Sequence, residues 1–440
     1  MLRGPRAAGG AVVRGKALSS PPGTRSAAAA AARRPSGPRR RCRAAAPASA
    51  AASAADAAGL DWSKPPPPGK RERRAENIDA GGFWVDTACI SCRVCRKMVP
   101  SVFGKVGGRS AVLRAPETDE ERVAAYGALL SCPTFSIHTD GRPDGALLRA
   151  ARDAFPLPAF PGAERVFFLG FADLAAIATS SYLVKRARPP SGSGGGGDVL
   201  FDAPRFAGPV VDALVRECGP QGPAFFVLSH RDDIGEHQRW AERFPGMRRV
   251  VHEREAAAVA SLGACEVILR GEGPWRLPDG AEDVLILLTP GHTSGSITLL
   301  YAPEQVALTG DHLDGAPPPA EFGVVPPPPP SPDDRQDLHA FRDYCWGSWD
   351  EQLASVAKLS GRGGIRRVLP GHGSPALFGS GGHFDAAVER LLASELPGGA
   401  AAAKELLSAA HEALKREPAP QVAVAAAAAA VAAGVPIVGR

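Results

Sequence analysis

The 440-residue sequence contains no run of about 18 or more apolar residues, although hydrophobic residues make up 44% of it. A helix that crosses a bilayer needs an apolar stretch of about that length. The alanine-rich tract from Val422 to Val435 is too short and too weakly apolar. We therefore expect no membrane-spanning helix and no membrane partner.

Acidic residues are absent from residues 1–55, which hold ten Arg and one Lys. A segment rich in Ala, Arg and Ser and free of acids is typical of an organellar transit peptide, although a disordered alanine-rich arm has the same composition. We predict that residues 1–55 direct the chain to the chloroplast stroma, with the mitochondrion as the alternative. The rest of the chain has 40 basic and 46 acidic residues and no basic patch, so we expect no nucleic-acid partner.

Shifts in composition divide the rest of the chain. Residues 56–75, with the stiff stretch Lys64–Gly69, read as a linker. Residues 76–145 are compact and hold four of the eight cysteines, and residues 160–395 alternate short apolar runs with helical patterns. Such alternation predicts a layered α/β domain. We expect residues 396–440 to form an alanine-rich helical tail.

Four cysteines form a ligand pattern. Cys89, Cys92 and Cys95 follow one another at intervals of three, and Cys132 precedes a proline far along the chain. Four thiolates in this arrangement predict a [4Fe–4S] cluster. The alternatives are a structural zinc site, which usually pairs two Cys-x₂-Cys units, and disulfides, which a reducing stroma disfavours. Cys42, Cys218, Cys265 and Cys345 show no ligand pattern.

The stretch from Phe83 to His138 resembles single-cluster bacterial-type ferredoxins. Its matching parts are the cysteine triplet, Pro100 to Phe103, and Ser131 to Ile137. In two-cluster ferredoxins a further Cys-Pro follows the triplet, whereas Val99-Pro100 stands at that place here. The resemblance implies a ferredoxin-like α+β domain with one cluster.

Four short apolar runs in the second half of the chain are each followed by polar residues that can bind a metal. Ala224–Leu228 precedes Ser229-His230, Val284–Leu288 precedes a Gly-His pair at His292, Val306–Leu308 precedes a Gly-Asp pair at Asp311, and Arg367–Leu369 precedes a Gly-His pair at His372. Loops at strand ends can bring such side chains together, and imidazoles with carboxylates suit Zn²⁺, Mn²⁺ or iron. We expect one or two divalent metals at these loops.

The order of these motifs resembles the metallo-β-lactamase superfamily, so the chain reads as a plant or algal type of that superfamily with a cluster domain in front. The resemblance implies a four-layered αββα domain with a metal site at one rim of its two sheets. It implies further that His230 opens the first motif, that His292 binds one metal and His372 the other, and that Asp311 bridges the two.

The first motif departs from the usual His-x-His-x-Asp-His, because Asp232 replaces the second histidine and two extra residues precede Glu236-His237. The flavodiiron branch also has an acid at that second place.

If a helix starts near Asp233, then Asp233 and His237 share one face and can reach one site. Alternatively, Asp233 and Glu236 form a helix cap, and His237 joins a core face with Trp240 and Phe244. We predict His230, Asp232 and His237 as further metal ligands, and Asp232 or Asp233 as the catalytic carboxylate that orients the attacking hydroxide. His252 is predicted to be structural.

Three functions agree with these patterns. The first is a metal-dependent hydrolase of the ester, thioester or phosphoester class, which resembles glyoxalase II and acts on an unknown small molecule. The second is a plastid oxidoreductase in which electrons from a ferredoxin-type partner pass through the cluster to a di-iron site. The third is a redox sensor without catalytic activity.

Overall fold

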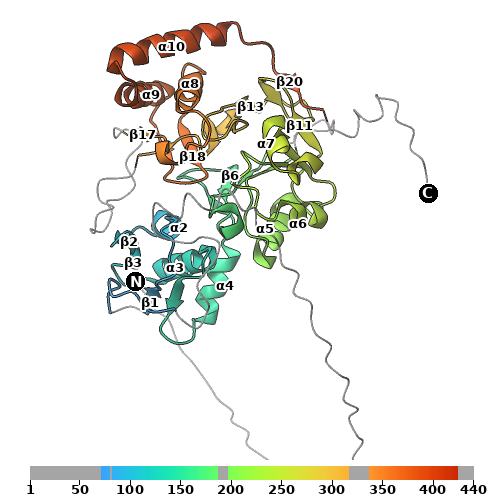
Figure 1. Cartoon of the computed structure of the whole chain (residues 1–440). Helices are drawn as coiled ribbons and strands as arrows, with labels where there is room; N and C mark the ends of the chain where they lie inside the picture. Colours follow the sequence, from blue (N-terminus) through green and yellow to red (C-terminus); the bar gives the residue numbers. More distant parts are fainter. Residues whose placement is uncertain (1–70, 80–81, 187–196, 317–335, 425–440) are drawn as a thin grey trace, which may run out of the picture. The chain divides into compact units, whose positions relative to one another are not determined.

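The computed structural model describes residues 71–79, 82–186, 197–316 and 336–424 (Figure 1). The predicted transit peptide, most of the predicted linker, Cys42 and the end of the tail lie outside these residues. In the described part of the chain, no helix combines the length and the apolar character that a bilayer crossing requires.

Residues 83–153 form a small α+β unit, as predicted for the cluster domain. Strand β1 (Phe83–Val85) pairs antiparallel with β4 (Ile137–Thr139), and β2 (Phe103–Val106) forms a hairpin with β3 (Arg109–Val112). The helices are α2 (Val94–Met98), α3 (Asp119–Ser131) and α4 (Gly145–Asp153). Helix α3 begins where the Thr118 side chain accepts a hydrogen bond from the Glu121 amide, which satisfies a donor that the helix itself leaves free.

The first large sheet has seven strands in the order β11-β10-β9-β8-β7-β6-β5. Strands β8 to β11 run parallel, and β5 to β8 pair antiparallel. Their bounds are β5 (Leu157–Pro158), β6 (Val166–Phe168), β7 (Tyr182–Val184), β8 (Val199–Phe201), β9 (Phe225–Val227), β10 (Arg248–His252) and β11 (Val267–Leu269).

The second large sheet also has seven strands, in the order β19-β18-β15-β14-β13-β12-β20. Their bounds are β12 (Trp275–Arg276), β13 (Val284–Leu288), β14 (Ile297–Tyr301), β15 (Val306–Gly310), β18 (Arg367–Pro370), β19 (Ala376–Leu377) and β20 (Gln421–Val422). A separate ribbon joins β16 (Asp314–Gly315) to β17 (Leu338–His339). Strand β20 lies in the segment predicted as an alanine-rich helical tail. The sequence does not predict this strand, because a two-residue strand leaves no periodic signal.

Alternating side chains along the strands build the layers. On β9, Phe225 and Val227 face the core between the sheets, whereas Phe226 joins the outer core beneath α5 (Gly208–Cys218) and α6 (His237–Arg243). On β13, Ile286 faces the inner core and Leu287 the outer one. Successive strand residues point to opposite faces, so each sheet has helices on its outer side.

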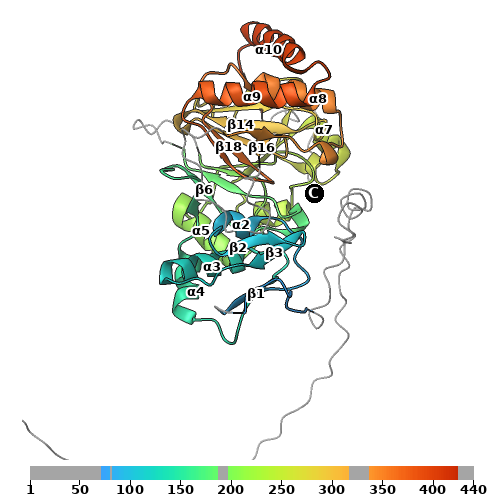
Figure 2. The same ribbon diagram turned by 90° about the vertical axis from the view of Figure 1, so that its left-hand side faces the viewer.

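Helices α8 (Trp349–Leu359) and α9 (Gly381–Glu395) cover the outer face of the second sheet, and α10 (Gly399–Lys415) packs on them (Figure 2). Helix α7 (Glu253–Ala258) follows β10 directly. The predicted four-layered αββα architecture is therefore confirmed.

Candidate functional site

The four predicted cluster cysteines line one cavity. Cys89, Cys92 and Cys95 surround the start of α2, and Cys132 ends α3, with apolar residues such as Ile90 and Val94 completing the wall. All seven cysteines of the described part of the chain are free, which gives no support to the disulfide alternative.

The cavity's electrostatics suit a cationic metal core. Burial raises the pKa of Cys92 well above its ordinary value, and the neighbouring thiols raise it further. Burial and the proximity of Cys89 raise the pKa of Cys95 to about 12. Four buried thiolates repel one another unless a metal cluster compensates their charge, so this donor set fits a [4Fe–4S] cluster.

Two backbone amides point at the cluster ligands. The Ser136 amide lies 3.2 Å from Cys132 Sγ, and the Ser91 amide lies 3.5 Å from Cys89 Sγ. Hydrogen bonds to ligand sulfurs are one of the means by which a protein sets a cluster's reduction potential.

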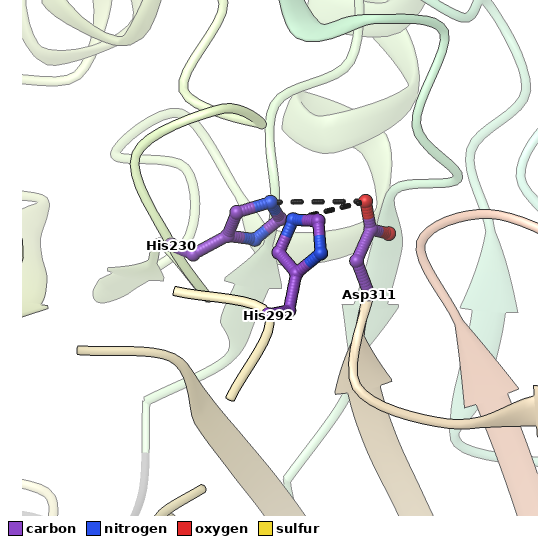
Figure 3. Close-up of side chains that lie close together, drawn as sticks. All are labelled: His230, His292 and Asp311. Atoms are coloured by element: carbon purple, nitrogen blue, oxygen red, sulfur yellow. Dashed lines mark ion pairs between the residues drawn. The ribbon is translucent and has the colours of Figure 1, made fainter. Parts of the chain in front are cut away.

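The predicted metal ligands follow the ends of strands from both large sheets. His230 follows β9, His292 follows β13, Asp311 follows β15 and His372 follows β18. Figure 3 shows His230, His292 and Asp311 pointing toward one another. Tertiary structure thus brings together side chains that are up to 142 residues apart in the sequence.

The first ligand group comprises His230, His292, Asp311 and Asp232. Asp311 Oδ2 lies 3.8 Å from His230 Nε2 and 3.7 Å from His292 Nε2. Asp232 Oδ2 lies 3.9 Å and 3.6 Å from the same two nitrogens. Within the described residues, His230 Nε2, His292 Nε2 and Asp232 Oδ2 are buried without a hydrogen-bond partner. Buried polar atoms are rarely left unsatisfied, so these ligand atoms fit a metal ion between them.

The second ligand group comprises Asp233, Asp311 and His372, whose ligand atoms lie within 4.8 Å of one another. Asp311 Oδ1 lies 2.7 Å from His372 Nδ1, so the two oxygens of Asp311 face different groups. Both carboxylate oxygens of Asp233 are buried and have no partner in the described part of the chain. A Cβ atom on Gly371 would lie 2.8 Å from Asp233 Oδ2 and 2.9 Å from Asp311 Oδ1, so this cradle requires glycine.

The second ligand group holds excess negative charge. Burial, together with the nearby Asp311, raises the pKa of Asp233 well above its ordinary value. Burial alone would lower the pKa of His372, but Asp311 and Asp233 raise it to about 10. For Asp311 the signs are reversed: burial alone would raise its pKa, but the nearby His372 holds the pKa of this carboxyl below its usual range. Protons therefore compensate charges that a divalent cation can compensate in their place.

Neighbouring residues orient the imidazoles. His230 Nδ1 lies 2.9 Å from Ser229 Oγ, which leaves Nε2 facing the site. His372 Nε2 donates to the Ile177 carbonyl at 2.8 Å, which turns Nδ1 toward Asp311. Such outer partners fix the tautomer and direction of metal-binding histidines.

Two supporting carboxylates were not identified from the sequence. Asp202, which follows β8, is buried and accepts a hydrogen bond from the Ser229 amide at 2.7 Å. It follows an apolar run, the same signal that located the ligand loops. Glu255 on α7 accepts hydrogen bonds from the amides of Arg231, one residue after His230, and Gly295, three residues after His292. No local pattern marks Glu255, because its partners come from two distant loops.

The structure does not bring His237, a predicted metal ligand, to either ligand group. Helix α6 begins at His237 and not near Asp233, so the two side chains do not share a helical face. His237 lies instead beside Arg249, with Nδ1 3.2 Å from Nη1, and beside Ser261. The alternative that His237 shares a core face with Trp240 and Phe244 agrees with the structure, since both aromatic residues are fully buried. The other alternative, a cap formed by Asp233 and Glu236, does not form.

His252 has the structural role that the sequence predicted. Its ring accepts a hydrogen bond from the Arg254 amide at the start of α7, and its Nε2 contacts the Gly271 carbonyl at 3.0 Å. The predicted catalytic residues divide between the groups, with Asp232 in the first ligand group and Asp233 in the second.

Residues 85–139 match the family model described as "4Fe-4S single cluster domain of Ferredoxin I". The predicted single-cluster domain is confirmed. The chain is also similar to a metallo-beta-lactamase from Pontibacter korlensis, with 15% identity, coverage of 52% of this chain and 97% of that chain, and a TM-score of 0.35. A second similar structure is a metallo-beta-lactamase family protein from Thermus thermophilus, with 18% identity, coverage of 53% and 79%, and a TM-score of 0.34. No curated protein matches the sequence.

Proposed function

We propose that the protein is a metal-dependent hydrolase of the ester, thioester or phosphoester class with a fused [4Fe–4S] domain. The observation that carries this proposal is the pair of adjoining ligand groups, which share Asp311 and contain buried ligand atoms without partners in the described chain. Each group has three ligand residues whose atoms lie within 4.8 Å of one another, and Asp232, 3.9 Å from His230 and 3.6 Å from His292, adds a fourth candidate ligand to the first group alone. Catalytic metal sites keep a position open, so substrate and water belong at the second group.

Asp233, Asp311 and His372 would hold a divalent ion there, which would supply Lewis-acid chemistry by polarising a carbonyl or phosphoryl oxygen and by lowering the pKa of water. The chain's own residues place the reactants. Asp311 faces both groups, the Ile177 carbonyl holds the His372 ring, and Asp233 offers oxygens that can orient the attacking water and take up its proton.

The donor set favours a harder ion than zinc. Asp232 adds an oxygen ligand at the place where the first motif of the metallo-β-lactamase superfamily, which this chain resembles, has a histidine. The second group has two carboxylates and one histidine. Oxygen-rich sites suit manganese or iron, so we propose one of these ions as the native metal.

The test is metal analysis followed by assay. Protein purified without oxygen is analysed for iron, zinc, manganese and acid-labile sulfide, and is then given chromogenic ester, thioester and phosphodiester substrates. We expect hydrolysis that a chelator removes and Mn²⁺ restores. His292→Ala, which removes a direct ligand, should lower kcat/KM by about 100-fold or more, whereas the exposed His383→Ala should not. Absence of hydrolysis with two ions bound would contradict the proposal.

One contact favours a second function, the plastid oxidoreductase. Arg93, next to the cluster ligand Cys92, contacts Ser374, two residues after His372. The cluster loop therefore adjoins the metal loop, as electron transfer from a ferredoxin-type donor would require. About six iron per chain without zinc or manganese, together with oxygen consumption driven by reduced ferredoxin, would support this function over hydrolysis.

A further inference from the structure

Two cationic side chains near the cluster ligands support the loop that carries His372, Arg93 by a direct contact and Lys97 through Ser180. Arg93 Nη2 donates to Ser374 Oγ at 2.9 Å. Lys97, two residues after Cys95, donates to Ser180 Oγ, and the Ser180 amide in turn donates to the Gly371 carbonyl at 2.7 Å. The loop is thus held on both sides of His372.

The backbone at Ile177 and Ala178, which leads to the Lys97 partner Ser180 and accepts a hydrogen bond from His372, is strained. Ile177 and Ala178 have φ angles of 50° and 70°, in the left-handed region that side chains with a Cβ disfavour. Strain of this kind persists only where surrounding contacts over-determine the backbone. The Ile177 carbonyl is the acceptor for His372 Nε2, so the strained segment positions a ligand of the second group.

The position of these two cations depends on the cluster ligands. Helix α2 has five residues, and its N-cap is Arg93 itself, at a φ of 69° and without a side-chain cap. A helix this short is not stable on its own. Cys92 precedes it and Cys95 lies within it, so the metal–sulfur bonds of a cluster would anchor α2 at both places.

We propose that the cluster domain supports the metal centre: the filled cluster site fixes α2, and Arg93 and Lys97 then hold the Gly371–Ser374 loop so that the second ligand group can bind its ion. Loss of the cluster releases the loop and lowers the affinity of the second ligand group for its ion, whereas the affinity of the first group does not change. The inference rests on the proposed function only in requiring a metal centre, and it holds whichever reaction the centre performs.

The experiment is a titration of the whole chain with Mn²⁺ alone, followed by the electron paramagnetic resonance signal of the free ion. The cluster is kept oxidised, and its content is checked by absorbance, iron and sulfide. Ser374→Ala and Ser180→Ala each remove an acceptor and little volume. Ser394→Ala is the matched control, because within the described residues its hydroxyl donates only to the Leu391 carbonyl of its own helix.

We expect wild type and Ser394→Ala to bind two Mn²⁺. In Ser374→Ala and Ser180→Ala, the affinity for one Mn²⁺ should fall by about tenfold or more, which is the range for loss of an outer partner of a metal ligand. The affinity for the other Mn²⁺ should change by less than about twofold, and the cluster content should not change. Cluster-free Cys132→Ser should lose the same Mn²⁺.

Unchanged Mn²⁺ affinities in these variants, or an equal loss of affinity for both ions, would overturn the proposal that the cluster domain supports the metal centre. The proposed hydrolase function would not be affected by either result. Failure of the wild type to bind Mn²⁺, Zn²⁺ or Fe²⁺ would overturn both, because no metal centre would then exist.

Discussion

Glu255 Oε1 accepts a hydrogen bond from the Gly295 amide at 2.7 Å. The second oxygen, Oε2, accepts one from the Arg231 amide at 3.1 Å. A single buried carboxylate therefore joins the loop of His230 to the loop of His292, and a Cβ atom on Gly295 would lie 2.7 Å from it.

Replacing this carboxylate by an amide should loosen the first ligand group. In Glu255→Gln the side-chain NH₂ cannot accept a hydrogen bond, so one buried amide loses its partner at a cost of about 1–3 kcal/mol. We expect metal affinity at the first group to fall by about 10–100-fold in a chelator competition. Glu253→Gln, on the same helix but bonded to Gly271, is the control. A lower melting temperature with unchanged metal affinity would contradict the positioning role.

Metal binding should release protons. The pKa of His372 is raised to about 10 without metal, so its ring is protonated at pH 7.5. Because the metal-free protein binds more protons, affinity should rise as pH rises toward 10. Titration calorimetry at pH 7.5 in buffers of different ionisation enthalpy should report at least one proton released. His372→Gln should release about one fewer, and equal release in both proteins would refute this account.

Gly371→Ala should damage the second ligand group. The added Cβ would lie 2.8 Å from Asp233 Oδ2 and 2.9 Å from Asp311 Oδ1, so these ligand oxygens must move. We expect kcat/KM to fall by about tenfold or more with the fold retained, as judged by circular dichroism. Gly246→Ala meets no atom within 4 Å and serves as the control. Full activity of Gly371→Ala would show that these oxygens are not ligands.

Cys132→Ser should abolish the intact cluster, because Cys132 supplies the only thiolate of the set from outside the α2 region in the described chain. Iron and sulfide should fall well below about four each per chain, and the visible absorbance of the cluster should be lost. Cys265→Ser replaces a buried cysteine outside the cavity and should keep a full cluster. A complete cluster in Cys132→Ser would exclude this residue as a ligand.

His237 should affect acid stability and not metal content. Burial lowers its pKa from 6.5 to about 4, and the nearby Arg249 adds to the effect. Between these values the unfolded chain binds more protons than the folded one, so the free energy of unfolding falls as pH falls from 6.5 to 4, by at most about 3 kcal/mol from this residue. Urea unfolding of His237→Gln should show a smaller fall, with the exposed His383→Gln as control. Loss of bound metal in His237→Gln would restore it as a candidate ligand.

The sequence was sufficient for local chemistry. The spacing of Cys89, Cys92 and Cys95, and the absence of a cysteine at Val99, predicted one cluster, because a tight loop imposes the geometry of its ligands. Apolar runs that end in His230, His292, Asp311 and His372 predicted convergent ligand loops, because strand ends of a layered fold meet at one edge.

Only the tertiary structure decided which candidates reach the site. His237 and Asp233 differ by four positions, and the unpredicted start of α6 separates them. Glu255 and the contacts of Arg93 and Lys97 involve partners from other elements, and such contacts leave no trace in local periodicity. The sequence thus determined which ligand types and folds are present, whereas long-range packing determined which side chains share an ion and which residues hold them there.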